Sequence, residues 1–512
     1  MKHTKKLSAI IMSAVLLATG CANGTSPGGS TAVKEESAPV TSENTGSSGE
    51  SSLPQAKSVK DTVGDVKVDT KVKFMAWYDL NNTDAANYFV SLFGMPEKIP
   101  EGYENKVKSS KKNSDGSEEP DTSPFVYVHV STYASRYTEL AKLIQSGDSP
   151  DAFPCDTSDF PYWVVNKYFD KIDNAIDLDN EEFAKYEKVR EKTKIGDHEY
   201  VPVYDTELSN LLWYRASVIK KNGFEDPWEL YEKDEWTWDK FLEMSKSFAD
   251  KENAKYAIDG YGTDFYLFAT TGLPLVELKD GTLRSNLTDE KIIKAMDFVR
   301  QFAPTQKGYR YPRETENSWV PCYSEWANGN TLFFNDGSWR YDETWRVYKK
   351  KNKWSDDEIN FVPYPRCDDE QTYYQSVQIN SFMLPKGSKN TEGYKALIYS
   401  QALLVNDEDI NKASRQEAKE EYDWNDKLLD RLDKLNAPDT FAPVVDYKVV
   451  LYPHDDLFCG DSYINVVCNW SYMSGEDYRA NIESEDGKEY IDSLEKIGIE
   501  PLNKIINEDL AN

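Results

Sequence analysis

The sequence predicts an α/β protein whose core is a parallel sheet. Short apolar runs at residues 71–77, 125–130 and 151–153 predict three strands. A helix-like stretch follows the first run, and residues 137–146 place apolar side chains on one helical face between the second and third runs. Because strands and helices alternate, and the run at 125–130 is apolar on both faces, we expect a parallel sheet covered by helices.

Local signals indicate where several elements begin and end. Gly147 and Pro150 end the helix at 137–146, since glycine tolerates a left-handed backbone and proline cannot continue a helix. Thr237 and Thr288 are expected to cap two later helices.

Further elements are expected along the rest of the chain. Strands are expected at 331–334, 360–362 and 377–383, and helices near 490–494 and 502–506. A polar stretch at about 100–122 predicts a surface loop.

The first twenty residues predict a signal peptide. Three lysines precede a short apolar run at 7–18, which is too short to span a bilayer core of about 30 Å. The sequence Leu-Ala-Thr-Gly-Cys at 17–21 resembles the lipobox of bacterial lipoproteins. The resemblance implies cleavage before Cys21, acylation of that residue, and stable anchoring through several acyl chains. An ordinary secretory signal with an incidental cysteine is the alternative.

Residues 21–68 are expected to form the lipidated cysteine and a disordered linker. The stretch 22–55 is rich in Ser, Gly, Thr, Glu and Pro and contains no aromatic residue, so it cannot bury enough apolar surface to fold. The mean hydropathy of the chain is −0.70, and no later apolar run is long enough to span a membrane. We therefore expect a body held at the extracellular face of a bacterial membrane.

Composition excludes several classes of partner and cofactor. The chain carries 60 basic and 89 acidic residues, a net charge of −29, which repels nucleic acid and anionic lipid surfaces. Six cysteines are present; with Cys21 acylated, the other five cannot all pair. Whether Cys459 bonds Cys468, or Cys322 bonds Cys367, stays open. Without a C-x-x-C motif, no metal or cofactor is expected.

Eight segments occur in order along the chain: 145–152 (QSGDSPDA), 211–216 (LLWYRA), 222–224 (NGF), 236–241 (WTWDKF), 326–330 (WANGN), 334–339 (FNDGSW), 361–365 (FVPYP) and 382–390 (FMLPKGSKN). As a series they resemble extracellular solute-binding protein family 1, the sugar-binding lipoproteins of ATP-binding-cassette (ABC) importers. Each segment is weak alone, whereas the series at the expected spacing is specific. The departures are the polar insert at 100–122, Trp213-Tyr214 where many members carry Tyr-Asn, and a longer C-terminal region.

The resemblance implies a fold of two α/β lobes, the type 2 periplasmic-binding-protein fold, with the ligand in a cleft between them. Residues 69–203 with 376–440 would form the first lobe, and 204–375 with 441–512 the second. Crossing strands are expected near 202–206, 375–381 and 438–445. The implied function is binding of a sugar or oligosaccharide by a monomer, cleft closure, and delivery to the permease subunits of an ABC importer.

Candidate ligand-binding residues combine aromatic rings, which cover the C–H faces of a sugar, with polar groups that satisfy its hydroxyls. Core packing is the alternative role for Trp77 and Trp470, and a turn or cap for Asp156. We expect Trp339 to be the main stacking residue. The predicted set is Trp77, Asp79, Asp156, Tyr204, Asp205, Asp336, Trp339, Gln378 and Trp470.

Two other functions remain open at this point. A lipid-anchored glycoside hydrolase would use two carboxylates roughly 5–10 Å apart, and 89 acidic residues do not exclude such a pair. No catalytic motif supports an enzyme, because G-x-S-x-G, G-x-x-x-x-G-K-[ST] and G-x-G-x-x-G are all absent from the sequence. A non-sugar ligand such as a peptide is the second alternative.

Overall fold

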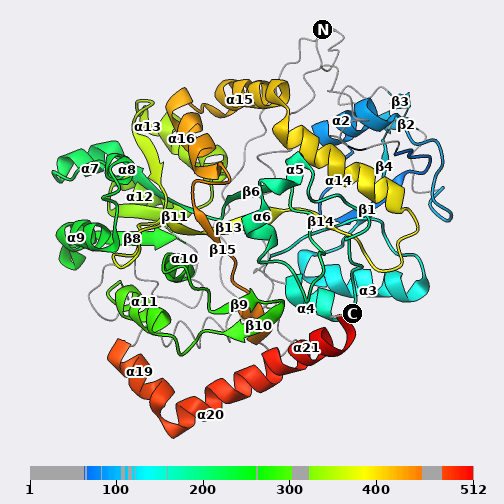
Figure 1. Ribbon diagram of the computed structural model, residues 1–512. Helices are drawn as coiled ribbons and strands as arrows, with labels where there is room; N and C mark the ends of the chain where they lie inside the picture. The colour runs from blue at the N-terminus through cyan, green and yellow to red at the C-terminus, as the bar shows by residue number, and fades with distance from the viewer. Residues whose placement is uncertain are drawn as a thin grey trace, which may run out of the picture.

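The computed structural model describes residues 63, 66–81, 83–104, 110–112, 118–120, 123–157, 160–260, 263–302, 322–451 and 475–510. The chain forms two α/β lobes, one containing α2, β1 and α14 and the other containing β8, β11 and α9, with strands running between them (Figure 1). The predicted fold class is confirmed.

The first lobe is built on a short parallel sheet. β1 (Val72–Ala76) pairs in parallel with β4 (Phe125–His129), and Phe74 forms a parallel bridge to Ala152. β5 (Phe153–Pro154) pairs with β14 (Phe382–Met383) and begins two residues after the start of the predicted strand at 151–153. The remaining elements are α2 (Asp84–Phe93), α3 (Arg136–Ser146), α4 (Phe160–Val165), α5 (Glu181–Ala184), α6 (Glu187–Arg190) and α14 (Thr391–Asn406).

In the first lobe, α3 ends where the sequence predicts, and the polar insert contains a hairpin that was not predicted. Gly147 ends α3 in a left-handed conformation, with φ of 74°. In the polar insert, the described residues form a small antiparallel hairpin of β2 (Ser110–Lys112) and β3 (Glu118–Pro120). Tyr103, before the hairpin, is buried, and its hydroxyl donates to Asp148 at 2.8 Å.

Three strands cross between the lobes and pair as one sheet in the order β15-β13-β6. They are β6 (Asp205–Leu208), β13 (Tyr374–Asn380) and β15 (Ala442–Val444). β13 is antiparallel to β6 and parallel to β15. These strands overlap the segments where crossings were expected, although β6 shares only residues 205–206 with the segment 202–206.

The second lobe contains a four-stranded sheet in the order β12-β7-β11-β8. β8 and β11 are parallel, and β7 is antiparallel to β11 and β12. The strands are β7 (Leu211–Arg215), β8 (Tyr256–Gly260), β11 (Thr331–Asp336) and β12 (Ile359–Val362). The helices are α7 (Ala216–Lys221), α8 (Pro227–Glu232), α9 (Trp238–Phe248), α10 (Thr263–Ala269), α11 (Glu290–Arg300), α12 (Tyr323–Asn328) and α13 (Arg346–Asn352).

The two predicted caps have different outcomes. Thr237 caps α9, and its side chain accepts from the amide of Lys240 at 3.4 Å. The prediction for Thr288 is wrong, because Asp289 caps α11 by accepting from the amide of Lys291 at 2.8 Å. An aspartate is an equally good cap and adds a negative charge near the positive end of the helix.

Helix α16 (Asp426–Asn436) packs on the second lobe, which differs from the predicted boundary at residue 440. Leu428 and Leu435 lie in a core cluster with Trp213 and Trp228, and Arg431 donates to Asn360 at 2.9 Å. The reason is the direction of β15: because it runs parallel to β13, the chain must return to the second lobe before it crosses again.

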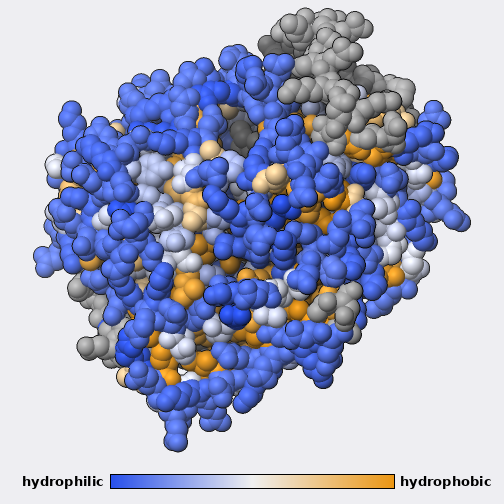
Figure 2. All heavy atoms as spheres, in the orientation of Figure 1, coloured by the Kyte–Doolittle hydropathy of each residue, from blue (hydrophilic) through white to orange (hydrophobic). Residues whose placement is uncertain are grey.

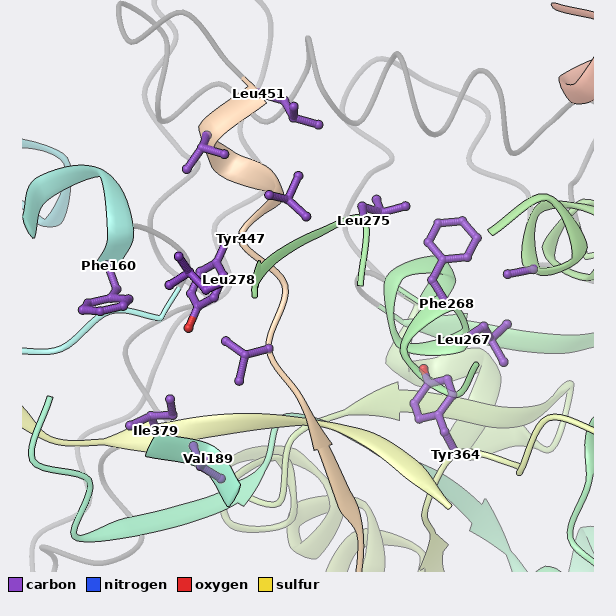
Figure 3. Close-up of a cluster of buried hydrophobic side chains, with 14 of the residues drawn as sticks. Phe160, Val189, Leu267, Phe268, Leu275, Leu278, Tyr364, Ile379, Tyr447 and Leu451 are labelled. Carbon is purple, nitrogen blue, oxygen red and sulfur yellow. The ribbon is translucent and has the colours of Figure 1, made fainter. Parts of the chain in front are cut away.

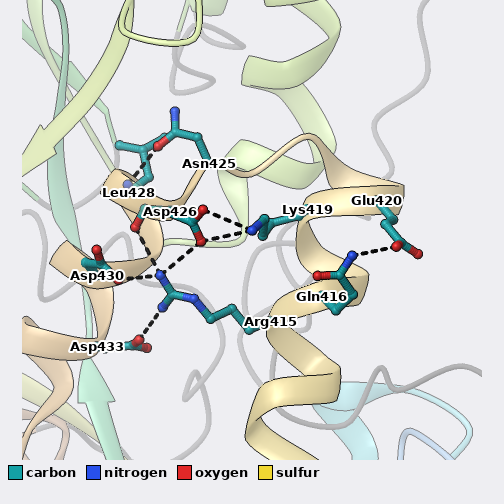
Figure 4. A network of polar contacts seen from close by, with 9 residues as sticks. All are labelled: Arg415, Gln416, Lys419, Glu420, Asn425, Asp426, Leu428, Asp430 and Asp433. Atoms are coloured by element: carbon teal, nitrogen blue, oxygen red, sulfur yellow. Dashed lines mark hydrogen bonds and ion pairs between the residues drawn. The ribbon is translucent and has the colours of Figure 1, made fainter.

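A surface ion network joins α15 (Glu408–Tyr422), which carries the chain from α14 towards the second lobe, to α16 (Figure 4). Arg415 lies among three carboxylates of α16; its Nη1 is 2.6 Å from Asp433, and its Nη2 contacts Asp426 and Asp430. Lys419 pairs with Asp426 at 2.9 Å. Exposed pairs of this kind each contribute about 0–1 kcal/mol, so the network orients the two helices more than it stabilises the fold.

The C-terminal helices contact both lobes rather than the second alone. α19 (Gly475–Glu483) packs on α11, and α21 (Glu500–Ile505) reaches α4 of the first lobe, joined by α20 (Glu485–Leu494) (Figure 1). The predicted helices near 490–494 and 502–506 are confirmed within α20 and α21, and the other lobe boundaries stay predictions.

One hydrophobic core extends across both lobes beside the crossing strands. Tyr447, just after β15, lies 6.0 Å from Phe160 of α4 between ring centroids, and its hydroxyl donates to the carbonyl of Lys192 at 2.7 Å (Figure 3). The hairpin of β9 (Val276–Lys279) and β10 (Thr282–Ser285) also reaches the first lobe. The amide of Gly196 donates to Gly281, where a Cβ would lie 2.5 Å from the Gly196 oxygen.

The surface agrees with the acidic composition. Hydrophilic side chains cover most of the face seen in Figure 2, and hydrophobic ones show mainly in its central band and above the C-terminal helices. Among the described residues, no helix is both long and apolar enough to cross a membrane. Cys322 and Cys367 form no disulfide in the described part of the chain, and Cys459 and Cys468 lie outside it.

Candidate functional site

The candidate site is defined by the carboxyl ends of the strands in each lobe. In open α/β sheets, loops at this edge hold the ligand. In the first lobe, Trp77 follows β1, Tyr133 follows β4, and Asp156 follows β5. In the second lobe, Asp336 is the last residue of β11 and Trp339 comes three residues later.

Aromatic rings and one arginine form a continuous stack in the first lobe. The ring of Trp77 lies edge-on to Tyr133, with centroids 4.9 Å apart. The guanidinium of Arg136 lies 3.7 Å from the Tyr133 centroid and 4.6 Å from the Tyr137 centroid. Tyr137 stacks on Trp163 with centroids 4.3 Å apart and the planes 13° apart. We call Trp77, Tyr133, Arg136, Tyr137 and Trp163 the first aromatic wall.

Two indole N–H groups of this wall are buried without an acceptor among the described residues. They belong to Trp77 and Trp163. A buried N–H without a partner costs about 1–3 kcal/mol, so each group would gain from an acceptor supplied by a ligand or water. Trp77 is only partly buried and also packs against the core, so ring stacking and core packing remain joint roles for it.

Asp156 is committed to the first wall. Its Oδ2 accepts from Arg136 at 2.9 Å and from the hydroxyl of Tyr133. Asp79, two residues after Trp77, accepts from the amide of Asn81 at 2.9 Å and stabilises the turn after β1.

The second lobe has a matching group, which we call the second aromatic wall: Trp339, Arg340, Tyr323 and Asp336. The Arg340 guanidinium lies 4.0 Å from the Trp339 centroid and 4.6 Å from the Tyr323 centroid. Its Nε donates to Asp336 at 2.6 Å, and the amide of Gly337 donates to the same carboxylate at 2.9 Å. Burial raises the pKa of Asp336 to about 6, although Arg340 opposes the rise.

The crossing strands place four polar side chains on one face of their sheet. Asp205 and Glu207 alternate along β6, and Asn380 and Gln378 lie opposite them on β13. Asn380 donates to Asp205 at 2.9 Å. Burial raises the pKa of Asp205. Two predicted residues, Asp205 and Gln378, therefore share this face.

Tyr204 lies elsewhere. It is 6% exposed and packs in the core of the first lobe with Phe74, Phe382 and Tyr394. Successive side chains of an extended segment point in opposite directions, so Tyr204 turns away from Asp205. Two more predicted residues, Trp470 and the lipidation site Cys21, lie outside the described residues.

Glu207 borders a small recess against the end of α16 and the residues that follow it. Leu435, Asn436 and Phe441 line the recess with it. Its Oε1 is buried without a hydrogen-bond partner among the described residues. Burial, reinforced by the nearby charge of Asp205, raises the pKa of Glu207 to about 8, so the carboxyl is mostly protonated at neutral pH.

Sequence reasoning missed eight residues of these groups: Tyr133, Arg136, Tyr137, Trp163, Glu207, Tyr323, Arg340 and Asn380. The period-two pattern of Asp205 and Glu207 in β6 was a visible signal for one of them. The two arginines gave no signal in the sequence, because the rings and carboxylates that each one contacts are recognised only in the folded protein. Within the described part of the chain, no group of three or more His, Cys, Asp or Glu side chains is arranged to hold a metal ion.

We predict that Glu207→Gln reduces the pH dependence of stability. The unfolded carboxyl releases its proton near 4.5 and the folded one near 8, so the wild type loses stability as the pH rises through this window. The variant lacks that titration, and its Tm should fall by a few degrees less than the wild-type Tm between about pH 5 and about pH 9. Thermal melts measure this, with the exposed Glu408→Gln as the control. Parallel curves for Glu207→Gln and wild type would refute the prediction.

Comparisons with known proteins identify the family and the fold of the chain. The family model described as bacterial extracellular solute-binding protein matches residues 121–416, more than half of the chain. No curated protein matches the chain.

Many solved structures share the fold. A cyclo/maltodextrin-binding protein in complex with maltotetraose is 14% identical, with 84% of this chain and 97% of that chain covered and a TM-score of 0.53. An extracellular solute-binding protein from Staphylococcus aureus in complex with maltose is 10% identical, with 84% and 98% covered and a TM-score of 0.53. The GacH receptor of Streptomyces glaucescens, solved unliganded and with acarbose, is 12% identical, with 84% and 99% covered and a TM-score of 0.53.

The identities to these structures are low, so the structural likeness establishes the fold, and the family model establishes the family. That family consists of proteins that bind solutes and not of enzymes, so the hydrolase alternative loses its support. The chain belongs to the bacterial extracellular solute-binding proteins.

Proposed function

We propose that the solute is a neutral carbohydrate, most simply an oligosaccharide, held between the two aromatic walls. The observation that carries the proposal is that each lobe places a tryptophan, a tyrosine and a neutralised Asp–Arg pair at the carboxyl ends of its strands. Flat rings cover the C–H faces of a sugar, and indole N–H groups donate to its oxygens. Since both carboxylates are already paired with arginine, neither wall favours a charged ligand.

Trp77 and Trp339 are the proposed ring contacts. Asp79, Asp205, Gln378 and Trp470 stay predicted polar and aromatic contacts. The solved relatives in the fold support a sugar, since their complexes contain maltotetraose, maltose and acarbose.

The proposed mechanism is closure of the two lobes about the crossing strands. A ligand that contacts both walls only in the closed form shifts the population towards that form. The closed form would then dock on the permease subunits of an ABC importer, with the protein acting as a monomer. The extracellular family of the chain supports this role.

The screen that tests the ligand uses a panel of neutral oligosaccharides beside short peptides. We expect oligosaccharides to bind without release of new reducing ends. Binding of peptides alone, or cleavage of the sugars, would overturn the proposal.

We predict that Trp339→Ala weakens binding of an oligosaccharide found in that screen. Loss of one large ring contact is expected to cost about 1–3 kcal/mol, roughly a 5- to 150-fold lower affinity. Isothermal titration calorimetry measures it. Trp354→Ala is the matched control, because Trp354 lies under Arg215 elsewhere in the second lobe. Equal affinities of Trp339→Ala and wild type would remove Trp339 from the site.

We also propose that Cys21 is acylated and anchors the protein through a linker. This linker ends before the predicted residue 68, because Val63 and Val68 are buried in the core of the first lobe. The lipobox-like sequence at 17–21 supports this. The wild type expressed in a bacterium should partition into the detergent phase of a Triton X-114 extract, and Cys21→Ser into the aqueous phase. Detergent partitioning of both proteins would show that Cys21 is not the anchor.

A further inference from the structure

Both aromatic walls are held by a buried arginine. Arg136 is 1% exposed and Arg340 is 6% exposed. Each guanidinium lies near two aromatic rings and bonds an aspartate of its own lobe, and Arg340 also pairs with Glu343 at 3.1 Å. The two lobes differ in sequence and topology, yet they build the same arrangement at the same edge.

The hydrogen bonds of Asp156 and Asp336 indicate the role of these two aspartates. Asp156 accepts from Arg136 and from the Tyr133 hydroxyl, and it is 9% exposed. Asp336 accepts from Arg340 and from the Gly337 amide, and it is 2% exposed. Buried carboxylates with two donors each are engaged in holding the arginine, and little of their surface remains for a ligand.

The arginines in turn fix the rings. A planar guanidinium packed on an aromatic face restricts the tilt of the ring, whereas a lysine ammonium attracts the ring without offering a flat surface to stack on it. In the first wall the contact reaches Trp77 through Tyr133. In the second wall it reaches Trp339 directly, and a Cβ at Gly337 would lie 2.2 Å from the Trp339 Nε1, so the indole lies against the turn.

We propose that Arg136 and Arg340 are positioning residues that preset Trp77 and Trp339 for the solute, and that Asp156 and Asp336 bind these arginines instead of the ligand. This inference rests on the proposed function in one respect: ordering the rings in advance is expected to tighten binding of the proposed sugar. The ring geometry itself does not depend on a ligand.

The test therefore begins without a ligand, on the full chain labelled with 5-fluorotryptophan. The ¹⁹F resonances of Trp77 and Trp339 are assigned from Trp77→Phe and Trp339→Phe. We expect Arg136→Lys to shift or broaden the Trp77 resonance and leave that of Trp339 unchanged, and Arg340→Lys to do the reverse. Arg190→Lys is the control, because Arg190 forms a buried pair with Glu199 in the first lobe and should change neither resonance.

Affinity is then measured with an oligosaccharide taken from the screen. Arg136→Lys and Arg340→Lys are expected to bind it about 2- to 10-fold more weakly, with Tm changes no larger than that of Arg190→Lys. If either lysine variant fails to fold, Asp156→Asn or Asp336→Asn replaces it, since asparagine keeps an acceptor oxygen.

The outcomes separate the two proposals. If no oligosaccharide binds but the reciprocal ¹⁹F pattern is present, the proposed ligand is wrong and the positioning role stands. If oligosaccharides bind but the arginine variants leave both resonances and the affinity unchanged, the positioning role is wrong.

Discussion

The pairing of β13 with β6 and β15 is the constraint on which the rest of the structure depends. Because these strands carry the chain between the lobes, their register fixes how the two sheets face each other. The direction of β15 then decides that α16 packs on the second lobe, and that the chain after β15 meets Phe160 and Lys192 of the first. A slip of one residue in β13 would turn Gln378 and Asn380 to the opposite face of the sheet.

A shared apolar core on one side of the crossing strands limits which motions the lobes can make. Tyr447, the β9–β10 hairpin and the C-terminal helices contact both lobes, and Asn503 of α21 bonds the backbone N–H and C=O of Leu283, both at 2.8 Å. Separating the lobes there would expose a large apolar surface. Opening is therefore expected in the parts of the lobe interface that this core does not join.

The sequence predicted the elements whose signals are local. Periodicity located β4 and α3, Gly147 ended α3, and Thr237 capped α9, because each signal acts over a few residues. The crossing strands came from the family resemblance, since three short segments far apart in the chain carry no common local pattern. The prediction for Thr288 was wrong because Thr288 and Asp289 are both suitable cap residues. The residue at which the helix begins decides between them, and α11 begins directly after Asp289.

The site was harder to predict than the fold. Trp77, Asp336 and Trp339 could be named because they lie at the ends of strands. Tyr204 was predicted to contact the ligand but lies in the core, because its side chain points to the side opposite that of Asp205. Arg136 and Arg340 were missed because an arginine is expected at the surface. Only the fold shows which carboxylate and which aromatic rings bury it.

Small-angle X-ray scattering with and without a bound oligosaccharide tests the central claim, that two lobes close on a solute, most directly. A decrease in the radius of gyration at saturating sugar, absent from a Trp339→Ala sample too weak to bind at that concentration, is the predicted result. An unchanged radius in the saturated wild type would contradict closure.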